Sequence, residues 1–222
     1  MSSKGLWCGS FFTFAFPLHH CENQVVARGL GGSLPSTRWK ERAHHLGWRP
    51  PQAGWRTLNI DGASNGNPTP AGAGGVIRDS SRQWVSGFVA NIGTTSAAQA
   101  ELWAFSYGLD LAWNTGCMHL NVESDSCLAI QLISSRHDPV HPYATLLSAI
   151  RRKVSHDWLV RITHTYREGN RVADWFSKHS LVYPYGTHEL ANPPSGLIHI
   201  LCEDTIDTIF ERRVVTHSDP FS

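Results

Sequence analysis

The chain has 222 residues, of which 41% are hydrophobic and 17% are charged, and its formal net charge is +1. This composition excludes disordered, collagen-like and coiled-coil chains, and the low net charge excludes a uniformly basic protein that coats nucleic acid. The five cysteines contain no Cys-x-x-Cys pair, so neither a zinc ribbon nor a disulfide framework is indicated. Because no run of about 18 apolar residues occurs, we expect no membrane span.

Charge and composition divide the chain into three parts. The net charge is +5 over residues 1–56, zero over 57–180 and −4 over 181–222. We expect a basic, flexible arm over residues 1–47 and a folded domain over 48–180. Residues 181–222 form an acidic tail, which could add a short helix to the domain or remain a segment for a partner.

The first residues leave the compartment open. The apolar stretch at 5–18 follows Lys4, but no small-x-small cleavage site comes after it. This pattern and the scattered cysteines favour an intracellular protein of the nucleus or cytoplasm. Import into an organelle remains an alternative, because the arm is basic and poor in acids.

From Thr57 onward the hydrophobic pattern becomes regular. It predicts a strand at 57–63, a hairpin of 72–79 and 83–92, a helix from Ser96 to 114, a strand at 118–123, helices at 126–133 and 143–154, a strand at 158–165 and a helix from Asn170 to 179. Ser96 and Gln99 form a predicted capping box, and Asn170 is the predicted N-cap of the last helix. This order predicts an α/β fold with a five-stranded mixed sheet and helices packed on it.

Four acidic residues stand at the ends of these elements. They are Asp61, Glu101, Asp125 and Asp174. Element ends can meet at one edge of a sheet, where carboxylates repel one another unless they are protonated or neutralised by cations. Oxygen ligands suit Mg²⁺ or Mn²⁺, and two such ions could activate water and stabilise the leaving oxygen in phosphodiester hydrolysis. Any one of these acids alone could equally be a cap or a surface charge.

The helix that contains Glu101 has a small face at that position. Ala97, Ala104 and Gly108 share this face with Glu101 at helical spacing. Small residues allow a helix to approach a sheet closely, so the pattern predicts that Glu101 points inward.

Four motifs carry a family resemblance. They are Asp-Gly-Ala-Ser-Asn-Gly-Asn-Pro at 61–68, Ala-Glu-Leu at 100–102, Glu-Ser-Asp-Ser at 123–126 and Arg-Glu-Gly-Asn-Arg-Val-Ala-Asp at 167–174. In this order they resemble the type 1 ribonuclease H domain, and more closely its plant branch associated with retroelement reverse transcriptases. The lead-in from Trp48 to Trp55 fits that branch. The resemblance covers residues 48–180 and implies the ribonuclease H-like three-layer fold, with helices on both faces of the sheet.

The resemblance assigns roles to particular residues. Asp61, Glu101, Asp125 and Asp174 match the family's metal-binding catalytic acids. His164 matches the family's mobile histidine, which shuttles protons or helps the product leave, although it could also end a strand for packing reasons. Ser64, Gly66 and Asn67 match the nucleic-acid-binding turn, although a Gly-Asn turn is common in any loop.

The function implied by the resemblance is that of an RNA–DNA hybrid ribonuclease. Such an endonuclease hydrolyses the RNA strand with two Mg²⁺ ions, or with Mn²⁺, and leaves 5′-phosphate and 3′-hydroxyl ends. The expected partner is nucleic acid, no membrane or protein partner is inferred, and we expect a monomer.

Three departures from the family pattern favour alternatives. The segment 95–99 lacks the asparagine that often precedes the helical glutamate, and Cys127 replaces a polar amide. No basic, tryptophan-rich protrusion precedes Asp174, and the cationic cluster there is Arg151-Arg152-Lys153. One alternative is therefore an inactive, retroelement-derived module that binds nucleic acid. Another is a nuclease of the same fold that acts on other substrates, such as single-strand ends.

Overall fold

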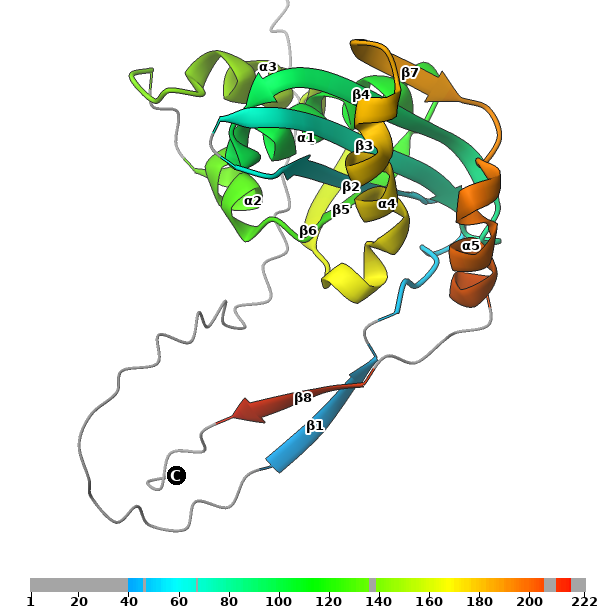
Figure 1. Ribbon diagram of the computed structural model, residues 1–222. Helices are drawn as coiled ribbons and strands as arrows, with labels where there is room; N and C mark the ends of the chain where they lie inside the picture. The colour runs from blue at the N-terminus through cyan, green and yellow to red at the C-terminus, as the bar shows by residue number, and fades with distance from the viewer. Residues whose placement is uncertain (1–39, 46, 67, 136–138, 206–210, 217–222) are drawn as a thin grey trace, which may run out of the picture.

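The computed structural model describes residues 40–45, 47–66, 68–135, 139–205 and 211–216 (Figure 1). The main sheet has six strands in the order β6-β5-β2-β3-β4-β7. Its strands are β2 (Arg56–Ser64), β3 (Thr69–Asp79), β4 (Trp84–Thr95), β5 (His119–Ser124), β6 (Leu159–His164) and β7 (Gly186–Leu190). The helices are α1 (Ala97–Asn114), α2 (Cys127–Ser134), α3 (Ala144–Val154), α4 (Arg171–His179) and α5 (Ile198–Thr205). The remaining strands, β1 (Lys40–His45) and β8 (Glu211–Thr216), pair in a separate two-stranded sheet.

The main sheet is mixed, as the sequence predicted. Strands β2, β3, β4 and β7 are antiparallel neighbours, whereas β5 is parallel to both β2 and β6. Parallel strands end at the same edge, so β2, β5 and β6 all deliver their carboxyl ends there. Asn59 of β2 lies opposite Glu123 of β5. Two residues after each of these come Asp61, still within β2, and Asp125, just after β5.

Helices cover both faces of the sheet (Figure 1). The larger buried cluster joins apolar side chains of β2 to β6 to those of α1, α2 and α3. The second cluster joins Val76 and Val89 of the sheet to Val172 and Phe176 of α4 and to residues before and within α5. The predicted three-layer α/β arrangement is therefore confirmed, with one core on each side of the sheet.

The predicted elements between residues 57 and 179 all form, and their ends shift by a few residues. The capping box forms only in part. The backbone amide of Gln99 donates to the Ser96 hydroxyl at 3.2 Å, as a capping box requires. The Gln99 side chain, however, accepts a 2.7 Å hydrogen bond from the Thr95 hydroxyl. Residues 1–39 of the predicted arm lie outside the described residues.

The sheet has six strands where the sequence predicted five. The extra strand, β7, comes from the predicted acidic tail and pairs with the outer edge of β4. Its sequence, Gly-Thr-His-Glu-Leu, has five residues and too little alternation to stand out as a strand. Helix α5 of the same tail contributes Ile200 to the second core. The tail thus adds both a strand and the short helix that the sequence had left open.

Helix α1 packs closely against β2 through its predicted small face. A Cβ added at Gly62 would lie 2.3 Å from both the Ala100 carbonyl carbon and the Glu101 nitrogen. A Cβ added at Gly108 would meet the side chains of Ile60 and Leu58 at 2.9 Å. The absence of a side chain at Gly62 therefore allows the Glu101 backbone to reach β2.

We expect Gly62→Ala to lower the free energy of unfolding by about 1–3 kcal/mol, because overpacking against a rigid backbone must move α1. Chemical denaturation measures the loss. Gly108→Ala is the matched control, because the nearest atoms to its Cβ are side-chain methyl groups rather than backbone and alanine favours the helix. Equal losses in the two variants would contradict this explanation.

Candidate metal centre

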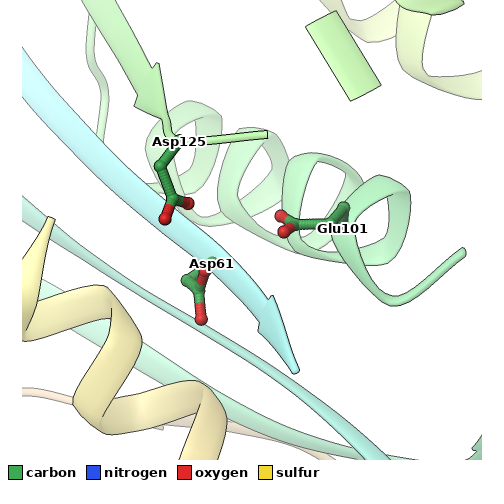
Figure 2. Close-up of side chains that lie close together, drawn as sticks. All are labelled: Asp61, Glu101 and Asp125. Atoms are coloured by element: carbon green, nitrogen blue, oxygen red, sulfur yellow. The ribbon is translucent and has the colours of Figure 1, made fainter. Parts of the chain in front are cut away.

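Three carboxylates meet at the edge where the parallel strands end. Asp61 lies near the end of β2, Asp125 follows β5, and Glu101 points toward them from α1 (Figure 2). One oxygen from each side chain lies within 4.8 Å of the other two. The strand register places Asp61 beside Asp125, and the close approach at Gly62 brings in Glu101.

Burial and mutual repulsion raise the proton affinity of this group. The pKa of Asp61 is raised from 3.8 to about 7, and the largest cause is the burial of its side chain. The charges of Asp125 and Asp174 also raise this pKa, whereas a hydrogen bond from Ser177 lowers it. The pKa of Glu101 also lies well above its usual value, because of burial and then the charges of Asp61 and Asp125. Such a group is stabilised by protons or by a bound cation.

Asp174 lies beside the three grouped carboxylates and does not share their 4.8 Å cluster. It stands in the first turn of α4, and its side chain is 18% exposed. Its Oδ2 forms a 2.6 Å ion pair with Lys178, and Arg167 lies 3.3 Å from its Oδ1. That Oδ1 is buried and accepts no hydrogen bond from the described residues. The structure therefore brings all four predicted acids to one edge but separates the fourth from the other three.

Two side chains that sequence reasoning missed hold the carboxylates. Ser177 of α4 donates a hydrogen bond to Asp61 Oδ2. Asn170 donates to the Ile60 carbonyl at 2.9 Å and to Asp125 Oδ1 at 3.4 Å. The predicted N-cap position of Asn170 is confirmed, but its side chain makes no cap bond to α4. Its place inside the fourth motif was the available signal for a site role.

The predicted histidine ends a strand at the same edge. His164 is the last residue of β6 and pairs in register with Ser124, which directly precedes Asp125. Its ring is exposed and stands edge-on to Tyr166, with the ring centres 5.7 Å apart. It is not part of the three-carboxylate group.

The predicted nucleic-acid-binding turn is held by hydrogen bonds from Ser64 to residues of β3 and β4. The Ser64 hydroxyl lies 2.9 Å from the Thr69 hydroxyl and 3.1 Å from the Thr95 carbonyl oxygen. A Cβ at Gly66 would lie 2.6 Å from the Thr69 methyl group, which explains the glycine there. Asn67 lies outside the described residues.

The cationic cluster between Asp125 and Asp174 is largely used within the domain. Arg151 donates to the Leu132 carbonyl at 2.7 Å and to the Ile133 carbonyl at 3.0 Å. Lys153 pairs with Asp110 at 2.6 Å. These two cations stabilise helix packing.

Comparison with known proteins identifies the family. A protein-family model described as "Reverse transcriptase-like" matches residues 59–180, which is more than half of the chain. The chain belongs to this family. The matched region begins in β2 and ends just after α4, so it contains all four acids and both residues that hold them.

The reverse transcriptase-like domain is also similar to named ribonucleases H. An Arabidopsis thaliana protein named "Putative ribonuclease H protein" is 40% identical over 169 residues, which cover 76% of this chain and 27% of that protein. The chain thus spans about a quarter of that relative's length. Ribonuclease H1 of Halobacterium salinarum is 27% identical with a TM-score of 0.54, covering 58% of this chain and 98% of that one.

A third likeness supports the fold alone. The enzyme LC11-RNase H1, isolated from compost and solved in complex with an RNA/DNA hybrid, is 24% identical with a TM-score of 0.51. The match covers 57% of this chain and 96% of the LC11-RNase H1 chain. The fold is therefore ribonuclease H-like, as the sequence predicted. Among the described residues, no helix combines the length and apolar character that crossing a membrane requires.

Proposed function

We propose that this protein is a metal-dependent endoribonuclease that hydrolyses the RNA strand of RNA–DNA hybrids. The observation that carries the proposal is the cluster of Asp61, Glu101 and Asp125, with one oxygen of each within 4.8 Å of the others. The likeness to a ribonuclease H1 along nearly all of that enzyme's length supports the reaction class. The likeness to an enzyme solved with an RNA/DNA hybrid agrees with the fold that the proposal requires.

The residues present fit a hard divalent cation. Three carboxylates supply only oxygen, which Mg²⁺ and Mn²⁺ prefer. Burial and then the neighbouring negative charges raise the pKa of Asp61 and of Glu101, and a bound cation would offset that repulsion. Asp61, Glu101 and Asp125 would hold one ion, and the neighbouring Asp174 would help to hold a second. When bound, such ions activate water and stabilise the leaving oxygen of a phosphodiester.

The protein's own contribution is to position these groups. Ser177 orients Asp61, the backbone amide of Gly62 donates to Glu101 at 3.2 Å, and Asn170 links Asp125 to the Ile60 carbonyl. Each carboxylate is therefore fixed from a different element before a substrate arrives. We propose His164, exposed at the same edge, as the group that exchanges a proton at its imidazole. The turn of Ser64, Gly66 and Asn67 is the proposed contact with the nucleic acid.

Cleavage of a labelled RNA–DNA hybrid in Mg²⁺ tests the proposal. We expect the wild-type protein to cleave the RNA strand and to leave 5′-phosphate ends. Asp125→Asn should slow cleavage by at least about 100-fold, as removal of one group that stabilises developing charge typically does. Asp157→Asn, at an exposed acid after α3, is the matched control and should cleave like the wild-type protein. No cleavage by a folded wild-type protein would overturn the proposal.

A second candidate is a nucleic-acid-binding module without turnover. It is favoured by the use of Arg151 and Lys153 inside the domain, which leaves fewer cations for phosphate contacts. The polar groups of segment 95–99 are likewise used to begin α1. Hybrid binding in Ca²⁺ without cleavage in Mg²⁺ would identify this module. Parallel assays on duplex DNA and single strands would reveal a nuclease with another substrate.

A further inference from the structure

The fourth acid has a local counter-ion of its own. Lys178 Nζ lies 2.6 Å from Asp174 Oδ2, and the two residues are one helical turn apart on α4. Arg167 stands 3.3 Å from the other Asp174 oxygen and 3.8 Å from Asp125. Asp174 therefore faces two cationic side chains, and only Arg167 of these two also pairs with Asp125.

The Lys178 ion pair can open. Its side chain is 54% exposed, whereas that of Asp174 is 18% exposed. An exposed lysine exchanges contact with a carboxylate for contact with water at little cost, and Oδ2 of Asp174 can ligate a cation only when the pair is broken. Lys178 and a divalent cation thus compete for the same oxygen.

We propose that Lys178 is a positioning residue that acts as the internal counter-ion of Asp174 and weakens cation binding at the fourth acid. The Asp61–Glu101–Asp125 group then binds a cation at lower concentration, and the Asp174 side is occupied only at higher concentration. Lys178 sets the separation between these two affinities. This inference rests on the proposed metal site and adds the residue that regulates its second half.

Calorimetric titration of Mn²⁺ into the metal-free 222-residue chain tests the inference without any assay of activity. We expect Lys178→Met, which keeps the apolar stem without the charge, to strengthen the weaker binding event by about 2- to 5-fold. The tighter event should change little. Lys178→Arg should restore the wild-type affinity, and Asp174→Asn should remove the weaker event.

The matched control is Arg152→Met, which removes an exposed positive charge from α3 and should change neither event. Unchanged or weaker binding in Lys178→Met would overturn the inference. An equal strengthening by Arg152→Met would also overturn it, because the effect would then be one of net charge. Absence of Mn²⁺ binding in every protein, wild type included, would instead overturn the proposed metal site.

Discussion

In the absence of divalent cations, the free energy of unfolding contributed by Asp61 falls as the pH rises from about 4 to about 7. The folded protein raises the pKa of this carboxyl from 3.8 to about 7, so it binds the proton more tightly than the unfolded chain does. The stabilisation is complete below the unfolded pKa and is lost as the pH passes through the folded pKa. At about 1.4 kcal/mol per pKa unit, the loss is on the order of a few kcal/mol.

Urea unfolding of EDTA-treated protein between pH 4 and 8 measures this dependence. Asp61→Asn is the control, because its amide still accepts the Ser177 hydrogen bond but does not titrate. As the pH rises from 4 to 8, the free energy of unfolding of the variant should increase relative to that of the wild-type protein. Mg²⁺ at pH 8 should increase the free energy of unfolding of the wild-type protein more than that of the variant, since the cation replaces the lost protons. Parallel pH curves for the two proteins would contradict the expectation.

The sequence predicts the elements of the site better than it predicts their contacts. Regular hydrophobic spacing located β2, β5 and α1, and the four motifs located the acids. Asp61 meets Asp125 because Asn59 of β2 pairs with Glu123 of β5. This register is set by the whole sheet, and no local sequence pattern predicts it. The Asn170 side chain leaves its cap position for Asp125 because a carbonyl and a carboxylate of other elements lie within its reach.

In the tail, the sequence did not predict the elements themselves. The sequence left open whether the tail adds a short helix to the domain or remains a segment for a partner, because its short strand and helix carry weak periodicity. The structure attaches α5 through Asp204, a residue 126 positions away from its partner Arg78 on β3. No local rule predicts a contact across that separation. Long-range pairing therefore accounts for the difference between the five predicted strands and the six in the main sheet.

Arg78 is the centre of a buried polar network. It is 1% exposed, and its guanidinium donates to Asp204 at 2.6 Å and to the side-chain oxygen Oδ1 of Asn59 at 2.8 Å. The Trp48 ring covers it at 3.5 Å, and Asn59 in turn donates to Glu123 at 2.8 Å. Burial lowers the pKa of Arg78, and Asp204 opposes this shift. The network joins the lead-in, three strands and α5 around one charge.

We expect Asp204→Ala to lower the free energy of unfolding by about 3–5 kcal/mol, because it leaves the Arg78 charge buried without its carboxylate. Chemical denaturation measures the change. Asp110→Ala is the matched control: the same substitution breaks the Lys153 pair, which has the same 2.6 Å distance, but the Asp110 side chain is 53% exposed. That exposed pair should contribute at most about 1 kcal/mol. Equal losses in the two variants would mean that α5 only rests on the sheet, whereas a large difference would make the tail part of the folded domain.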